Sequence, residues 1–192
     1  MALLAGFKTL LLARSGRTDL CVATAMANRS QLATERLIGP LVNTTLVRTR
    51  IEADLTFQEA LSRVRDSVLE AYARQALPFD VLGRHLADDE GVDPESLMQA
   101  SLVLQNAFRP LELPNVTLRS FAYPDGQRPL PIDCTWLSVM LKETPAGIAG
   151  SCSYKTDRFA PGTLKQWMRD YRAILAKAAA NPETLLGRLS GG

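Results

Sequence analysis

The chain has 192 residues, of which 46% are hydrophobic and 22% are charged, and its formal net charge is +2. This balance is typical of a globular protein, and the length suits one domain or one lobe of a domain. The net charge is too small, and the arginines are too scattered, to indicate nucleic acid as a partner.

The first predicted element is a helix over residues 2–14. It lacks the cleavage site and basic n-region of a signal peptide and is too short to span a membrane, so we expect no membrane partner. A domain rarely begins in mid-helix, so we also expect the chain to be a truncation of something longer. The apolar residues of this helix share one face, which predicts an amphipathic core helix; they are Leu3, Leu4, Phe7, Leu10 and Leu11.

Two strands follow. Residues 19–26 form an apolar run of strand length, and residues 27–36 form a polar loop. Residues 38–48 read as a turn that leads into a second strand. Because Pro40 cannot donate to a hydrogen-bond ladder, we expect strand pairing to begin after it.

The middle of the chain is predicted to be helical. Thr56 and Glu59 have the spacing of a capping box, which predicts a helix behind them. Pro78 favours the start of a shorter helix over residues 78–86, and residues 87–94 are acidic and loop-like. The long helix places these residues on one face: Phe57, Ala60, Leu61, Val64, Val68, Ala71 and Tyr72.

The last third mixes strands with one long helix. Residues 132–141 and 148–154 are predicted strands whose short connection suggests an antiparallel hairpin. Pro161 opens a helix that Asn181 and Pro182 end. We further expect strands over residues 99–108 and 116–121 and a loop over residues 123–131. The sum is an α/β or α+β lobe, a mixed sheet covered by helices.

The titratable residues do not indicate an activity. His85 is the single histidine, no G-x-S-x-G nucleophile motif is present, and no phosphate-binding glycine loop occurs. We interpret His85 as a partly exposed helix residue and expect no metal site. Three cysteines without C-x-x-C spacing, Cys21, Cys134 and Cys152, predict small buried thiols in a reducing cytoplasm.

Two segments carry a family resemblance. Residues 38–48, Ile-Gly-Pro-Leu-Val-Asn-Thr-Thr-Leu-Val-Arg, are similar to the fifth core motif of condensation domains, Ile-Gly-x-Phe-Val-Asn-Thr with a downstream arginine. Residues 74–80, Arg-Gln-Ala-Leu-Pro-Phe-Asp, resemble the sixth motif, although Ala76 replaces its usual aspartate. Shorter matches at residues 103–106, 132–135 and 153–159 follow in the family's order. Residues 2–189 thus resemble the second half of a condensation domain from a nonribosomal peptide synthetase.

The resemblance implies a fold and a function. The fold is half of a chloramphenicol-acetyltransferase-like pair of lobes, here residues 1–189 with a tail or linker at 190–192. The complete domain forms an amide bond between donor and acceptor groups carried on the phosphopantetheine arms of carrier proteins, with no other cofactor. Expected partners are these carriers, the N-terminal lobe and neighbouring synthetase domains.

The family's His-His-x-x-x-Asp-Gly motif is absent from this chain. The resemblance therefore implies no catalytic residue here, only a tunnel wall and a carrier-docking surface, inactive alone. Two alternatives stay open: a non-catalytic module that docks carriers or synthetases, and a lobe of an epimerisation or terminal condensation-like domain. An isolated lobe is also expected to self-associate through its exposed inter-lobe face.

Specific residues are assigned from the resemblance. We expect a structural role, in place of ligand contact, for five motif residues: Gly39, Arg48, Gln75, Pro78 and Phe79. Asn43 and Thr44 have an equally weighted alternative, which is to satisfy buried backbone at a strand start. For Asn106 the alternative is a turn, and for Asp133 it is a surface carboxylate. The residues predicted to face the tunnel are Asn43, Thr44, Gln105, Asn106 and Asp133.

Overall fold

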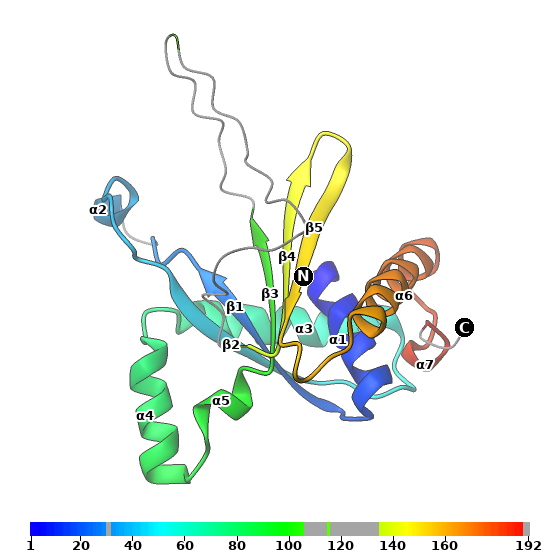
Figure 1. Ribbon diagram of the computed structural model, residues 1–192, viewed down its shortest axis with the longest axis horizontal. Coiled ribbons are helices and arrows are strands. Elements are labelled where there is room, and N and C mark those ends of the chain that lie inside the picture. The colour runs from blue at the N-terminus through cyan, green and yellow to red at the C-terminus, as the bar shows by residue number, and fades with distance from the viewer. Residues whose placement is uncertain (30–31, 106–114, 116–134, 190–192) are drawn as a thin grey trace.

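The computed structural model describes residues 1–29, 32–105, 115 and 135–189. Its strands form one five-stranded mixed sheet in the order β2-β1-β3-β4-β5 (Figure 1). β1 runs antiparallel to β2 and parallel to β3, β3 is parallel to β4, and β4 is antiparallel to β5. The strands are β1 (Asp19–Met26), β2 (Asn43–Arg50), β3 (Ala100–Gln105), β4 (Leu137–Thr144) and β5 (Gly147–Tyr154).

Helices cover one face of this sheet. Three long helices pack there around a shared apolar core: α1 (Ala2–Ser15), α3 (Phe57–Ala73) and α6 (Pro161–Ala180). The shorter helices are α2 (Leu32–Glu35), α4 (Phe79–Glu90), α5 (Pro94–Leu97) and α7 (Leu186–Leu189). We call the opposite side of the sheet the open face. The predicted class, a mixed sheet covered by helices, is confirmed.

The first helix is more deeply buried than its apolar stripe predicts. Leu4, Phe7 and Leu10 lie in the core as expected, but Lys8 and Thr9 are also fully buried. The helix is therefore enclosed on most sides instead of exposing a polar face. Gly6 allows this close approach, because a Cβ there would lie 2.5 Å from the Leu175 Cδ2 atom of α6.

The capping box at α3 is present as predicted. Thr56 Oγ1 accepts from the Glu59 amide at 3.2 Å, and the Glu59 carboxylate accepts from the Thr56 amide at 2.8 Å. Phe57, Ala60 and Val64 are buried, which confirms the predicted core side. Tyr72 is 52% exposed, so the expectation that it completes this stripe is wrong.

The acidic segment after residue 86 is helical, so the prediction of a loop there is wrong. α4 continues to Glu90, where Gly91 ends it in the left-handed region with φ 62°. Pairing four residues apart favours the helix, because His85 Nδ1 contacts the Asp89 carboxylate. The acidic side chains thus lie on an exposed helix end.

The C-terminal third follows the predicted order. β4 and β5 form an antiparallel hairpin closed by two residues, and α6 begins at Pro161 and is capped by Asn181. β3 begins one residue later than expected. The predicted strand at 116–121, the loop at 123–131, the tail at 190–192 and Cys134 lie outside the described residues. Cys21 and Cys152 are half-buried free thiols. Within the described part, no helix combines the length and apolar character needed to cross a membrane.

Candidate functional site

Two residues of the open face, Thr44 and Gln105, are 61 positions apart in the sequence and lie on strands β2 and β3, which β1 separates. Thr44 of β2 pairs with Ala25, and Ala23 pairs with Ser101. Because side chains alternate along each strand, Thr44 and Gln105 both point to the open face, at the same end of the sheet. Gln105 is exposed there and Thr44 is half-buried. We call this end of the open face the upper end.

Hydroxyl groups occupy the centre of the open face. Ser101 Oγ donates to Ser138 Oγ at 2.8 Å, and Thr135 Oγ1 lies 3.4 Å from Ser101 Oγ. All three side chains are buried, so these bonds satisfy polar atoms that water does not reach. These three hydroxyls therefore bond to one another inside the protein, and Gln105 at the upper end is a polar side chain that this face exposes.

Asn43 has a different environment from its neighbour Thr44. Its Nδ2 donates to the carbonyl oxygens of Gln75 at 2.9 Å and Leu77 at 2.7 Å. Its Oδ1 accepts from the Phe79 amide at 3.1 Å. The side chain thus ties the start of β2 to the connection between α3 and α4. This is the structural alternative given above for Asn43, and its role as a tunnel residue stays a prediction.

The motif residues around this connection have matching structural contacts. Gln75 is buried, and Pro78 occupies the N-cap position of α4 with φ −63°. Gly39 lies in a second loop, where its carbonyl accepts from Arg29 Nη2 at 3.2 Å. Arg29 Nη1 also donates to Thr34 O at 2.5 Å and Leu37 O at 2.7 Å. The Arg29 guanidinium therefore holds this loop by its backbone, a role that sequence reasoning missed.

The loop that Arg29 holds presents unusually exposed apolar side chains. We call residues 32–42 the apolar loop. Ile38 is fully exposed, and Leu32 is 84% exposed. Exposed apolar groups gathered in one place mark a surface that another body covers. The apolar loop leads directly into Asn43 and Thr44, so this surface adjoins the upper end of the open face. Its large exposed apolar residues are Leu32, Leu37, Ile38 and Val42.

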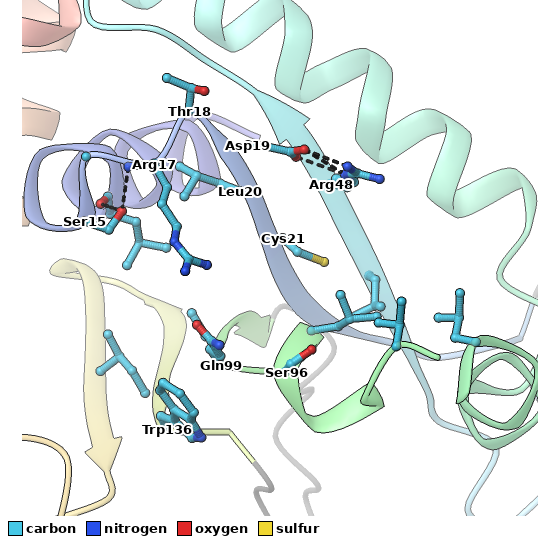
Figure 2. A pocket seen from close by; sticks show the side chains of 18 of the residues that line it. Ser15, Arg17, Thr18, Asp19, Leu20, Cys21, Arg48, Ser96, Gln99 and Trp136 are labelled. Carbon is cyan, nitrogen blue, oxygen red and sulfur yellow. Dashed lines mark hydrogen bonds and ion pairs between the residues drawn. The ribbon is translucent and has the colours of Figure 1, made fainter. Parts of the chain in front are cut away.

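The lower end of the open face contains a hollow of about 1180 Å³ (Figure 2). Strands β1 and β2 form one wall with Cys21 and Leu46, and α4 and α5 form another with Leu86 and Leu97. Trp136 lies across the hollow from Cys21 and Arg48. A cavity of this size and mixed lining is large enough for a substantial organic group.

An ion pair borders this hollow. Arg48 donates from Nε to Asp19 Oδ1 at 3.0 Å and from Nη2 to Asp19 Oδ2 at 2.7 Å (Figure 2). This two-pronged contact lowers the pKa of Asp19 below its ordinary value, chiefly through the hydrogen bond. The contact is an ion pair between neighbouring strands, as the structural role predicted for Arg48 requires. Burial raises the pKa of the nearby Cys21 thiol, so Cys21 is a poor nucleophile.

Aromatic residues close the other side of the hollow. Arg158 stacks over the Trp136 ring at 4.5 Å, and Phe159 meets Trp167 edge-on at 5.6 Å between centroids. Both tryptophans are half-buried and line the hollow. His85 also lines the hollow, is largely exposed and pairs with Asp89. Asn106 and Asp133 lie outside the described residues.

This geometry defines a class: a lobe whose mixed sheet packs long helices on one face and bears a hollow at one end of the other face. Comparison with known proteins gives the family. A family model described as "Condensation domain" matches residues 1–190. The chain belongs to the condensation-domain family, an amide-bond-forming family of nonribosomal peptide synthetases.

Individual proteins similar to this chain are consistent with this family and fold. A linear gramicidin synthase from Brevibacillus parabrevis is 36% identical over 185 residues, which cover 95% of this chain and 2% of that protein. The X-domain from teicoplanin biosynthesis is 28% identical with a TM-score of 0.76, covering 96% of this chain and 42% of that one. The first condensation domain of the calcium-dependent antibiotic synthetase shares the fold, with a TM-score of 0.75 and 19% identity over 97% of this chain and 40% of that one.

Proposed function

We propose that this chain is the C-terminal lobe of a condensation domain and forms one wall of the tunnel in which carrier-bound substrates meet. The observation that carries the proposal is the open face, where Thr44 and Gln105 lie at one end and the apolar loop adjoins them. The chain spans 40% of the calcium-dependent antibiotic synthetase condensation-domain structure, 42% of the teicoplanin X-domain structure and 2% of the gramicidin synthase subunit. A first lobe packed against the apolar loop would cover its exposed side chains.

The chemistry of the complete domain divides between the two lobes. The acceptor amine attacks the carbonyl carbon of the donor thioester, the carbon–sulfur bond breaks, and the amine proton passes to the departing thiolate. Any histidine that orients or deprotonates the amine belongs to the first lobe, because this chain has only His85 on exposed α4. This lobe contributes positioning of the phosphopantetheine arms, a main source of rate in such transfers.

The test of this proposal is amide formation by mass spectrometry. Donor and acceptor carrier proteins are loaded, and product is measured with this chain alone and with a first lobe containing His-His-x-x-x-Asp-Gly added in trans. We expect product only with both lobes. Product from this chain alone would contradict the proposal. No product in either mixture, together with binding of a carrier protein, would favour the non-catalytic docking module.

The tunnel residues give a second prediction. In the complemented protein, Thr44→Val and Gln105→Leu remove polar groups from the open face while keeping side-chain volume. We expect each to lower the rate of amide formation by roughly fivefold, since one hydrogen bond contributes about 1 kcal/mol. The free energy of unfolding should change by less than about 0.5 kcal/mol for exposed Gln105. Unchanged rates for both variants would remove these residues from the tunnel wall.

A further inference from the structure

The outer edge of β5 carries backbone groups that the rest of the described chain leaves unpaired. β5 is the last strand of the sheet, and β4 is the one described element in extensive contact with it. The β4–β5 hairpin extends beyond α1 and α6 (Figure 1). An unpaired edge strand is a template for another strand, and proteins usually block it with charge, proline or a covering loop. None of residues 147–154 is charged or proline.

The ladder shows which backbone groups point outward. Lys155 N donates to Trp136 O at 3.0 Å, so the odd-numbered residues of β5 bond to β4. In an antiparallel pair such bonds alternate. The amide and carbonyl groups of the even-numbered residues therefore point away from β4. These residues are Ile148, Gly150, Cys152 and Tyr154.

We propose that this edge pairs with β5 of a second copy of the chain, antiparallel across a two-fold axis at Ser151. In this register Ile148 lies opposite the Tyr154 position of the other copy, and Gly150 lies opposite Cys152. The even-numbered residues of the two β5 strands then form hydrogen-bonded pairs. Every outward amide and carbonyl group of β5 gains a partner in this way. Ser151 meets its own copy as a non-hydrogen-bonded pair.

The side chains of β5 suit pairing with themselves. The strand is uncharged, so two copies meet without electrostatic repulsion. Small, exposed residues at positions 147, 149, 151 and 153 leave the odd-numbered face of the strand open to approach. Two symmetry-related pairs of an isoleucine and a tyrosine add apolar and aromatic contact, which stabilises antiparallel strands. A second copy of β5 provides both an uncharged partner strand and the isoleucine–tyrosine pairs. The two five-stranded sheets then join into one sheet of ten strands.

The first experiment measures the oligomeric state by sedimentation equilibrium. We expect a dimer, and Ile148→Lys should raise the dissociation constant by roughly tenfold or more because it places two charges at the pairing edge. Ile148 is 55% exposed, so this change leaves the fold intact. Ile38→Lys in the apolar loop is the matched control, because it disrupts the self-association through the inter-lobe face that the sequence predicts and should leave a dimer joined at β5 unchanged. A monomeric chain, or dissociation by Ile38→Lys alone, would overturn the proposal.

A disulfide test fixes the register. In a chain with its three natural cysteines changed to serine, Ser151→Cys places two thiols across the axis, where strand partners lie about 4.5 Å apart between Cα atoms. We expect a linked dimer after mild oxidation. Ala149→Cys is the control, because its two copies lie about 13 Å apart in this register and cannot form the bond. Linkage of the control, but not of Ser151→Cys, would refute the register.

Discussion

Replacing Asn43 with alanine should lower the free energy of unfolding by about 2–3 kcal/mol. The change removes three hydrogen bonds to backbone groups, each worth about 1 kcal/mol. It also leaves the carbonyls of Gln75 and Leu77 and the amide of Phe79 without this partner. Urea unfolding measures the loss, and hydrogen exchange at the Phe79 amide should accelerate more than in the centre of α3.

This result separates the two roles given for Asn43. If the residue only holds the connection between α3 and α4, Asn43→Ala loses stability and the folded protein retains amide formation in the complemented assay. If Asn43 binds substrate, stability is unchanged and the rate falls. Thr44→Ala is the matched neighbour, on the other side of the strand, and should cost less than about 1 kcal/mol.

Asn43→Asp sharpens the comparison. Aspartate keeps an acceptor for the Phe79 amide but turns a second oxygen towards the carbonyls of Gln75 and Leu77. That repulsion should raise the pKa of the new carboxyl above its unfolded value of about 3.9. The variant should therefore be less stable than wild type at pH 7 and recover part of the difference as pH falls through the raised pKa. Equal differences at pH 7 and pH 4 would contradict these contacts.

Local sequence rules predicted much of the fold. The bounds of β1 and the Thr56 capping box follow from a short apolar run and from side chains three residues apart, which act within one element. α4 continues to Glu90, where His85 pairs with Asp89 four residues further on. The same run of acidic residues is also typical of a solvated loop. Composition alone therefore gave the wrong boundary there.

The site was less accessible to sequence reasoning. The motif around Asn43 and Thr44 located the correct strand, but neighbouring residues point to opposite sides of it. Which of the two reaches the open face depends on register, and the partners of Asn43 lie more than 30 positions away. The three carbonyls that Arg29 binds have no sequence signature. The exposure of the apolar loop similarly depends on what packs beside it.

Lys8 gives the second large prediction, because it is an amine inside the core. It is fully buried, and its Nζ donates to Leu20 O at 2.8 Å and Val47 O at 2.7 Å. These bonds join α1 to β1 and β2, the strand pair that carries Thr44. Burial lowers the pKa of Lys8 from 10.5 to about 8.

The lowered pKa makes stability depend on pH. Below pH 8 the amine is charged in both states, and the folded state bears the full cost of burying the charge. Between pH 8 and 10.5 the unfolded chain retains a proton that the folded chain has released, so stability rises with pH. Relative to Lys8→Met, wild type should gain about 2 kcal/mol between pH 7.5 and pH 10.

The comparison with Lys8→Met is necessary because other groups oppose this trend. Burial raises the pKa of the Cys152 thiol to about 11, so folding holds a proton that the unfolded chain releases above pH 9, and stability falls there. That contribution is the same in wild type and in Lys8→Met and cancels in the difference measured by urea unfolding. Parallel pH curves for the two proteins would mean that the amine keeps its ordinary pKa. A difference that grows towards pH 10 would establish that α1 is tied to β1 and β2 by a core lysine that is most stabilising when neutral.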